Sequence, residues 1–321
     1  MSLLDGWFAQ AGVRTDEPRV FTGVDDGADE GTALFSAAEV PELTHPLLDG
    51  LDERLREQLL AQHLYRYLLF TVHLETRVVN RAMTRMSTAD PGFAMSDRLR
   101  EDALKIYVDE GFHALANVRL VRQVADETGI RPVEYSFEPV LASLDAPIAD
   151  APTGYARVRE LLQATVFETL VTSTLDGVPK DQSVHPTVRA VVADHARDER
   201  VHHAFFVRLF PELWASLDAR TRSVVARDLP RIVHACVAPD LLAAARSLRS
   251  IGYGDAHIEQ VLGETYDAAT VTARTRRIAR HTLRLLRNTG VFDTAEAHDA
   301  FAAASLLVDD DVPEQRGRRS A

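Results

Sequence analysis

Several features are scarce in this sequence of 321 residues, and each scarcity excludes a class of protein. Cys236 is the only cysteine, so no internal disulfide framework can form and a reducing, cytoplasmic location is expected. Lysine is almost absent, since Lys105 and Lys180 are the only two among 36 basic residues. The formal net charge of −12 argues against nucleic acid or an anionic membrane surface as a partner.

Long apolar runs are missing as well. No stretch reaches the roughly 18 uncharged apolar residues of a membrane-spanning helix. The first residues lack the basic region and apolar core of a signal peptide. No segment alternates between apolar and polar residues as a half-buried strand does. With 46% apolar residues, typical of a globular chain, the sequence predicts an all-α protein outside the membrane.

The apolar periodicity predicts four long helices followed by shorter ones. The long helices are expected at about 52–86, 97–128, 153–175 and 186–210. Ser96 suits the N-cap of the second, Gly129 its end, and Pro211 the end of the fourth. Further helices are expected near 219–237, 240–250, 255–264, 265–288 and 294–307. We expect an irregular N-terminal arm (1–50), a single domain (51–308) and a flexible tail (309–321).

Each of the four long helices carries one glutamate among apolar neighbours at helical spacing. A carboxylate in that position is costly unless it is paired or bound to metal. The four are Glu75, Glu110, Glu168 and Glu199. A histidine follows Glu110 and Glu199 three residues later. The four helices therefore show the order Glu, ExxH, Glu, ExxH of ferritin-like dimetal sites. A further pair, Glu42 and His45, lies between Pro41 and Pro46 and is attributed to chance.

Charge supports a site for two metal ions. Four carboxylates and neutral imidazoles sum to −4, which two divalent cations would balance. Oxygen and nitrogen donors in this mixture suit iron or manganese better than a structural zinc. Asp109 and Asp198 each precede a glutamate of the set, and could accept the second N–H of a ligand histidine on a neighbouring helix. An alternative for both is a solvated helix position.

One histidine exceeds the ferritin-like set. His195 lies four residues before Glu199 and shares its helix face, either as a third nitrogen ligand or as a hydrogen-bonded core histidine. With it, the chain resembles the p-aminobenzoate N-oxygenase family of non-haem diiron proteins over about residues 55–290. The matching motifs are Glu75, then Glu110 and His113 in DEGFH, Glu168 in VFETL, and His195, Glu199 and His202 in HARDERVH.

The resemblance implies a ferritin-like four-helix bundle with additional C-terminal helices. It implies two iron ions held by those seven residues, O₂ as co-substrate and electrons from an external donor. It also implies N-oxygenation of a small-molecule amine, for arylamines through hydroxylamine and nitroso stages toward nitro products. Such enzymes belong to secondary metabolism, including antibiotic biosynthesis. A homodimer is possible, because long bundles often pair.

Substrate-binding residues are harder to place. On helix 265–288, Arg274 or Arg277 could hold a carboxylate, although solvated arginines are common. Leu74, Val78, Val171 and Thr172 lie beside the expected ligands and could line a cavity or simply pack in the core. Other functions stay open: a diiron hydroxylase or desaturase acting on carbon, a ferroxidase, or a manganese catalase. The sequence does not identify the substrate or the electron donor.

Overall fold

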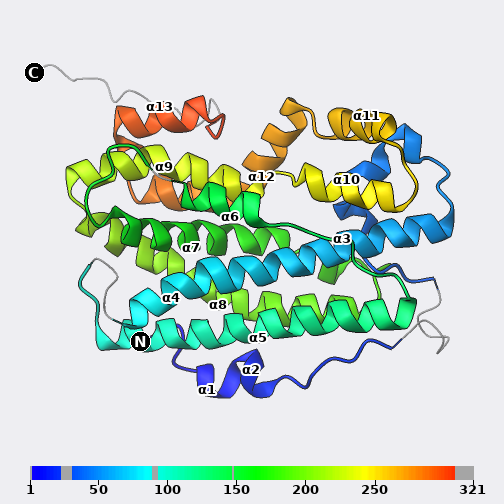
Figure 1. The fold of residues 1–321 in the computed structure, drawn as a ribbon. Coiled ribbons are helices and arrows are strands. Elements are labelled where there is room, and N and C mark those ends of the chain that lie inside the picture. The colour runs from blue at the N-terminus through cyan, green and yellow to red at the C-terminus, as the bar shows by residue number, and fades with distance from the viewer. Residues whose placement is uncertain (1, 23–30, 89–92, 147, 308–321) are drawn as a thin grey trace, which may run out of the picture.

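The structure is a computed structural model that describes residues 2–22, 31–88, 93–146 and 148–307, except the side chains of residues 172 and 173. Within these ranges it holds helices and turns but no β-strand, only an isolated bridge between Ala33 and Val184. The expected all-α, ferritin-like fold is confirmed (Figure 1). None of the described helices is both long and apolar enough to cross a membrane.

The first long helix of the bundle is built from three consecutive pieces. These are α3 (Glu53–Leu74), the π-helical turn η5 (Glu75–Val79) and α4 (Asn80–Ser87). Asp52 begins it by accepting a hydrogen bond from the backbone N–H of Arg54. A π-helical turn contains one extra residue and redirects the side chains around it. Here the turn starts at Glu75, one of the predicted metal ligands.

The second long helix, α5 (Asp97–Thr128), begins and ends where the sequence predicts. The Ser96 hydroxyl accepts a hydrogen bond from the backbone N–H of Leu99. Gly129 has a φ of 72°, a left-handed conformation that glycine adopts without strain and that ends many helices. Helix α5 packs against α3, α4 and α8.

The bundle is completed by α7 (Tyr155–Thr174) and α8 (Pro186–Ser216), which pack against each other. The prediction that the fourth helix ends before Pro211 is wrong, because α8 continues through this proline. A proline inside a helix costs about 3 kcal/mol. Continuation beyond the proline keeps Leu213 and Trp214 buried, and burial of a large apolar side chain contributes roughly 1.5–3 kcal/mol. The apolar face therefore outweighs the proline.

Helix α6 (Glu138–Asp145) and the C-terminal helices cover one side of the bundle (Figure 1). The C-terminal ones agree with the predicted ranges to within a few residues: α9 (Ala219–Val237), α10 (Leu241–Ser250), α11 (Asp255–Thr265), α12 (Ala268–Asn288) and α13 (Ala295–Ala303). Helices α9 and α12 pack on α7, and α10 packs on α3. The short helix α6 lies between the second and third long helices, where no helix was predicted.

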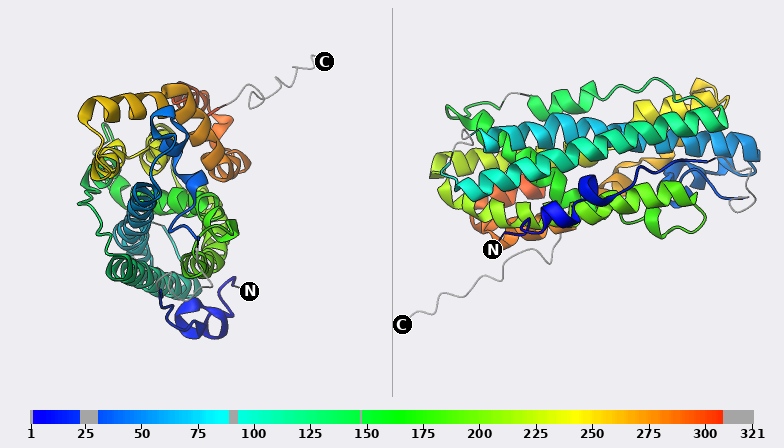
Figure 2. Two further views of the ribbon diagram at one scale, coloured as in Figure 1. Left: turned by 90° about the vertical axis from the view of Figure 1, so that its right-hand side faces the viewer. Right: turned by 90° about the horizontal axis from the view of Figure 1, so that it is seen from below.

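On the opposite side, the chain from residue 2 to 22 runs along the bundle and is called the N-terminal strap below. It contains two one-turn helices, α1 (Trp7–Gln10) and α2 (Gly12–Thr15), and α2 contacts both α5 and α8. Figure 2 shows the strap lying beneath these two helices, away from the C-terminal ones. Within residues 31–50 of the predicted arm, the chain forms the 3-10 turns η2 (Ala37–Glu39), η3 (Pro41–Thr44) and η4 (Pro46–Leu48). The division into arm, domain and tail stays a prediction, and residues 309–321 lie outside the described residues.

Candidate metal centre

The bundle interior brings together the seven side chains that the sequence singles out. The glutamates come from four helices, and each is at most 1% exposed: Glu75, Glu110, Glu168 and Glu199. The histidines are at most 6% exposed and come from α5 and α8: His113, His195 and His202. Carboxylates are almost never this deeply buried without a partner charge. The structure therefore gathers in one place seven polar side chains whose burial is costly in free energy.

The donor atoms fall into two groups. Glu75, His113, His195 and Glu199 form the first, and Glu110, Glu168, Glu199 and His202 form the second, with donors within 4.8 Å of one another in each. Glu199 belongs to both groups. Its carboxylate therefore lies between the two groups and would be available to both ions.

The distances inside each group suit a shared cation. Two donors that each lie about 2.1 Å from one ion are roughly 3–4 Å apart. In the first group, His195 Nε2 lies 3.0 Å from Glu75 Oε1 and 3.1 Å from Glu199 Oε1. In the second, His202 Nδ1 lies 3.0 Å from Glu110 Oε1 and 3.4 Å from Glu199 Oε1.

Most of the oxygen and nitrogen atoms that face one another in the two groups are buried without a hydrogen-bond partner among the described residues. They include both carboxylate oxygens of Glu75, Glu110 and Glu168, Oε2 of Glu199, and Nδ1 of His113 and His202. A buried polar atom left unpaired costs about 1–3 kcal/mol, more when it is charged. Cations bound within the two groups would account for so many buried oxygen and nitrogen atoms without hydrogen bonds. The residues present therefore fit two divalent metal ions.

The ionisation of the metal-free protein points the same way. Burial raises the pKa of Glu75 to about 7 despite the neighbouring His195. Burial also raises the pKa of Glu168 well above its usual range, and Glu199 and Glu110 add to the shift. For Glu199 the effect of burial is outweighed by nearby imidazoles, chiefly His202, so its pKa is lowered. Without metal, protons supply the positive charge that the cluster needs.

Asp109 and Asp198 each lie next to a histidine of the neighbouring helix, the position that the sequence predicts for them. Asp109 Oδ2 on α5 is 3.2 Å from Nε2 of His202 on α8, and Asp198 Oδ2 on α8 is 3.2 Å from Nε2 of His113 on α5. Each carboxylate thus accepts the Nε2–H of a histidine on the other helix. When the imidazole is neutral, this contact places its proton on Nε2 and leaves Nδ1, which faces the carboxylate cluster, able to bind a metal ion, as in metal-ligating histidines.

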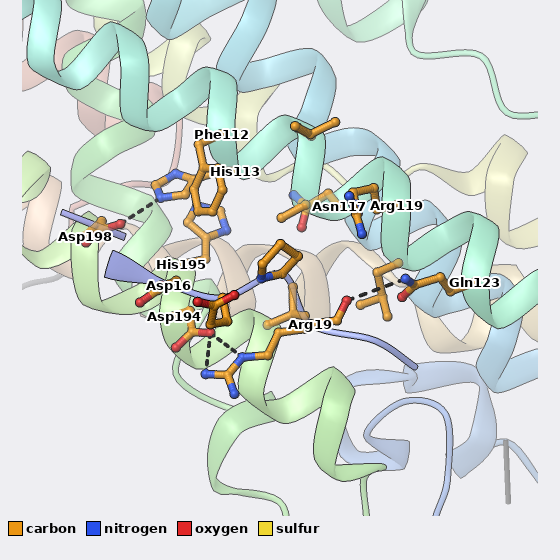
Figure 3. A pocket seen from close by; sticks show the side chains of 16 residues that line it. Asp16, Arg19, Phe112, His113, Asn117, Arg119, Gln123, Asp194, His195 and Asp198 are labelled. Atoms are coloured by element: carbon orange, nitrogen blue, oxygen red, sulfur yellow. Dashed lines mark hydrogen bonds and ion pairs between the residues drawn. The ribbon is translucent and has the colours of Figure 1, made fainter. Parts of the chain in front are cut away.

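His195 is oriented differently. It faces the cluster through Nε2, and its ring centroid lies 4.2 Å from that of His113. The other ring nitrogen of His195, Nδ1, forms no hydrogen bond among the described residues. The side chain borders a mostly apolar cavity of about 110 Å³ that is also lined by Phe112, Asp198 and Arg19 of the strap (Figure 3).

A second, larger cavity of about 170 Å³ lies on the side of the C-terminal helices. Of the predicted substrate-binding residues, Leu74, Val171, Arg274 and Arg277 line it. Val78 does not, because its side chain is buried in the core at 1% exposure. The side chain of Thr172 lies outside the described ones.

Sequence reasoning missed several polar residues of this second cavity. Glu42 is fully buried there and accepts a hydrogen bond from the Tyr266 hydroxyl at 2.9 Å. Its other oxygen lies 3.5 Å from His63 Nε2, while His45 pairs with Glu264 instead. Glu42 and His45 thus have different partners, and Glu42 lines the cavity.

Tyr67 is a further cavity residue that the sequence did not reveal. Its hydroxyl is buried without a hydrogen-bond partner. Burial raises the pKa of Tyr67 well above its usual range, and the carboxylates of Glu39, Glu75 and Glu199 raise it further. The hydroxyl therefore stays protonated and lies between the cavity and the carboxylate cluster.

The fold and its paired carboxylate groups define the class of ferritin-like diiron proteins. Within this class, the family described as P-aminobenzoate N-oxygenase AurF matches residues 24–290, and the chain belongs to that family. It is similar to a 4-aminobenzoate N-oxygenase of Streptomyces thioluteus, with 25% identity over 260 residues, 79% of this chain and 76% of the relative. The protein is thus an amine-oxygenating enzyme with a non-haem diiron cofactor.

Proposed function

We propose that the enzyme N-oxygenates a small arylamine that carries an anionic group, toward the hydroxylamine, nitroso or nitro level. The observation that carries this substrate class is the larger cavity, which begins beside the metal ligands and ends at unpaired arginines. The relative named for 4-aminobenzoate, an arylamine with a carboxylate, supports the same class.

The proposed ligands of the two irons are the seven side chains of the two groups, with Glu199 shared. When bound, the reduced irons supply the electrons and open positions that O₂ activation requires. The protein holds the ligands in place through the opposing Asp–His pairs. Leu74, Phe167 and Val171 form an apolar wall next to the carboxylates and limit the access of water.

The size of the larger cavity restricts the substrate. At about 170 Å³ it is close to the roughly 150 Å³ of an engineered apolar cavity that binds benzene. Phe35, Tyr67, Phe70 and Phe167 contribute aromatic surface for one ring. We infer a single substituted ring rather than a fused or long-chain amine.

The positive charge of arginines at the far side of the cavity selects an anionic substituent on the substrate ring. Arg274 is half-buried and Arg277 exposed on α12, and neither has an ion pair or hydrogen bond among the described residues. Arg66 has only a distant contact, 3.8 Å from Asp240. A carboxylate on the ring would pair with these guanidinium groups while the amine faces the metal ligands.

The test is a panel of amines given to the iron-loaded, reduced protein with O₂, with product mass as the readout. We expect oxygen on the nitrogen of anionic arylamines, and a KM for 4-aminobenzoate at least about tenfold higher in Arg274→Gln, since a hydrogen bond between charged groups is lost. The KM for uncharged aniline should not change. Arg284→Gln is the matched control, because Arg284 is exposed on the same helix outside the cavity. Oxygen found only on carbon would overturn the proposal.

Three further assignments remain proposals. We propose an external reductase or ferredoxin as electron donor, a cytoplasmic location and a homodimer. The lone cysteine supports the location. An exposed apolar face of α5 supports the dimer and is tested below.

A further inference from the structure

The N-terminal strap contacts the two aspartates that brace the ligand histidines. We propose that Trp7 and Gly12 are positioning residues of the metal centre, acting through Asp109 and Asp198. The strap precedes the family-matched range of 24–290, so this role is not part of that match. The inference rests on the proposed ligand set but not on the identity of the substrate.

Trp7 fixes the first aspartate. Its indole Nε1–H lies 2.9 Å from Oδ1 and 2.8 Å from Oδ2 of Asp109, so both carboxylate oxygens share one donor. Oδ2 also accepts the Nε2–H of His202 at 3.2 Å. The carboxylate is held between indole and imidazole, and its plane cannot rotate without losing one of them. Phenylalanine would keep the ring but remove the donor.

Gly12 fixes the second aspartate. Its backbone N–H donates to Oδ2 of Asp198 at 3.2 Å, and the same oxygen accepts the Nε2–H of His113 at 3.2 Å. A Cβ atom at Gly12 would lie 2.6 Å from that oxygen, closer than Cβ contacts normally come. Any other residue would therefore push away either the strap or the buried carboxylate.

The two contacts act on opposite helices. Trp7 supports an aspartate of α5 that serves a histidine of α8, and Gly12 supports an aspartate of α8 that serves a histidine of α5. Neutral N–H donors orient the carboxylates and leave their charge available to the imidazoles. Changes to such supporting groups typically alter metal affinity about 10- to 100-fold.

The strap has anchors that do not involve these aspartates. Three apolar side chains are at most 5% exposed: Leu4, Ala11 and Phe21. Three ion pairs join the strap to α5 and α8: Asp5–Arg98, Asp16–Arg197 and Arg19–Asp194. Loss of one indole hydrogen bond should therefore leave the strap in place.

Cobalt(II) is a suitable probe, because its visible absorption and its release to a chelator both report on ligand geometry without turnover. Trp7→Phe should release cobalt about tenfold faster and alter the absorption. Trypsin cleavage at the exposed Arg14 and Arg19 should keep its wild-type rate, which shows that the strap is still bound. Gly12→Ala should change the two cobalt readouts in the same direction.

Two controls separate positioning from general loosening. Phe8→Leu changes a neighbouring side chain that is 65% exposed, and Asp5→Asn breaks the ion pair to Arg98 without contacting either aspartate. Both should leave the cobalt readouts unchanged. Wild-type release and absorption in Trp7→Phe and Gly12→Ala would overturn the inference, and so would an equal effect in Asp5→Asn. Wild-type protein that fails to bind two cobalt ions would instead contradict the proposed ligand set.

Discussion

At the scale of single residues, the candidate site is built from buried carboxylates and imidazoles, and many of their polar atoms have no hydrogen-bond partner among the described residues. Glu75 and Glu168 are the clearest cases, since both oxygens of each are buried without a hydrogen bond. Removing such a carboxylate removes an unpaired buried group and costs the fold little. It should cost the metal centre much more, because each carboxylate supplies one of the negative charges that balance the ions.

Glu75→Ala and Glu168→Ala should therefore lose metal but keep helical structure. We expect less than two irons per chain by metal analysis, no N-oxygenation, and a circular dichroism spectrum like that of the wild type. Glu160→Ala on α7 is a matched control, because that carboxylate pairs with Arg85 away from the cluster. Full iron loading and turnover in either variant would show that the glutamate is only a buried polar residue.

His195→Ala should affect the centre less than loss of a braced histidine. His113 and His202 each pair with an aspartate, whereas the second nitrogen of His195 has no hydrogen bond among the described residues. The substitution leaves all four carboxylates, so the charge balance is kept. Iron loading should fall partly and turnover should fall strongly, while His113→Ala should lose most of its metal. Normal loading and turnover in His195→Ala would mark it as a core histidine.

Metal binding should release protons and weaken at low pH. In the metal-free protein, burial lowers the pKa of His195, but the carboxylates of Glu75 and Glu199 outweigh this effect and raise the pKa to about 8. Burial raises the pKa of Glu75 to about 7. A group with a raised pKa holds a proton at neutral pH, and the cation must displace it. Apparent affinity should therefore fall as the pH is lowered from 8 through 7. Calorimetry in buffers of different ionisation enthalpy would measure the protons, and a pH-independent affinity would contradict this.

The cluster of seven buried glutamates and histidines was predictable because each member repeats the helical spacing of its apolar neighbours. Trp7 and Gly12 were not, because their partners lie 102 and 186 residues away in sequence and neither stands in a recognisable motif. Contacts of this kind depend on where a segment without periodicity comes to rest. The cavity position of Glu42 was not predictable either, because its partner Tyr266 lies 224 residues away in sequence.

At the scale of elements, the π-helical turn η5 is the feature that sequence periodicity could not reveal. Apolar residues on either side of it keep a spacing compatible with an α-helix, so the extra residue passes unnoticed. The continuation of α8 through Pro211 is comparable, since the buried face beyond the proline decides the outcome. The long helices themselves followed from the spacing of apolar residues and from their caps.

Deleting Thr76 should convert this turn to regular α-helix and redirect Glu75. Thr76 is exposed, and its hydroxyl donates a hydrogen bond to the backbone oxygen of Val72. We expect helical content to be retained and metal loading to drop below two ions per chain. Thr76→Ala is the control and should load normally. Two ions bound with wild-type affinity in the deletion variant would show that the turn does not position the ligand.

At the scale of the whole molecule, α5 presents an apolar face to solvent. Five of its side chains are between 41% and 55% exposed and fall at helical spacing: Leu104, Tyr107, Val108, Leu115 and Val118. Gly111 lies in the middle of this face and leaves open space for a close approach. Contiguous exposed apolar surface of this kind is characteristic of interaction sites.

The proposed homodimer should therefore depend on α5. Leu115→Glu should give a monomer in light scattering coupled to size exclusion, because it places a charge within the apolar face. Leu242→Glu is the control, since Leu242 is exposed to a similar extent on α10. A wild-type protein that is monomeric at tens of micromolar would contradict the proposal.

The unequal composition of the two donor groups has a consequence for metal selectivity. One group offers two imidazoles and two carboxylates, and the other offers one imidazole and three carboxylates. Imidazole favours later transition metals, whereas carboxylate favours manganese and magnesium. In a cell where manganese competes with iron, the two positions would be filled with different preferences. We therefore expect replacement of iron by manganese to be easier at the carboxylate-rich position than at the imidazole-rich one.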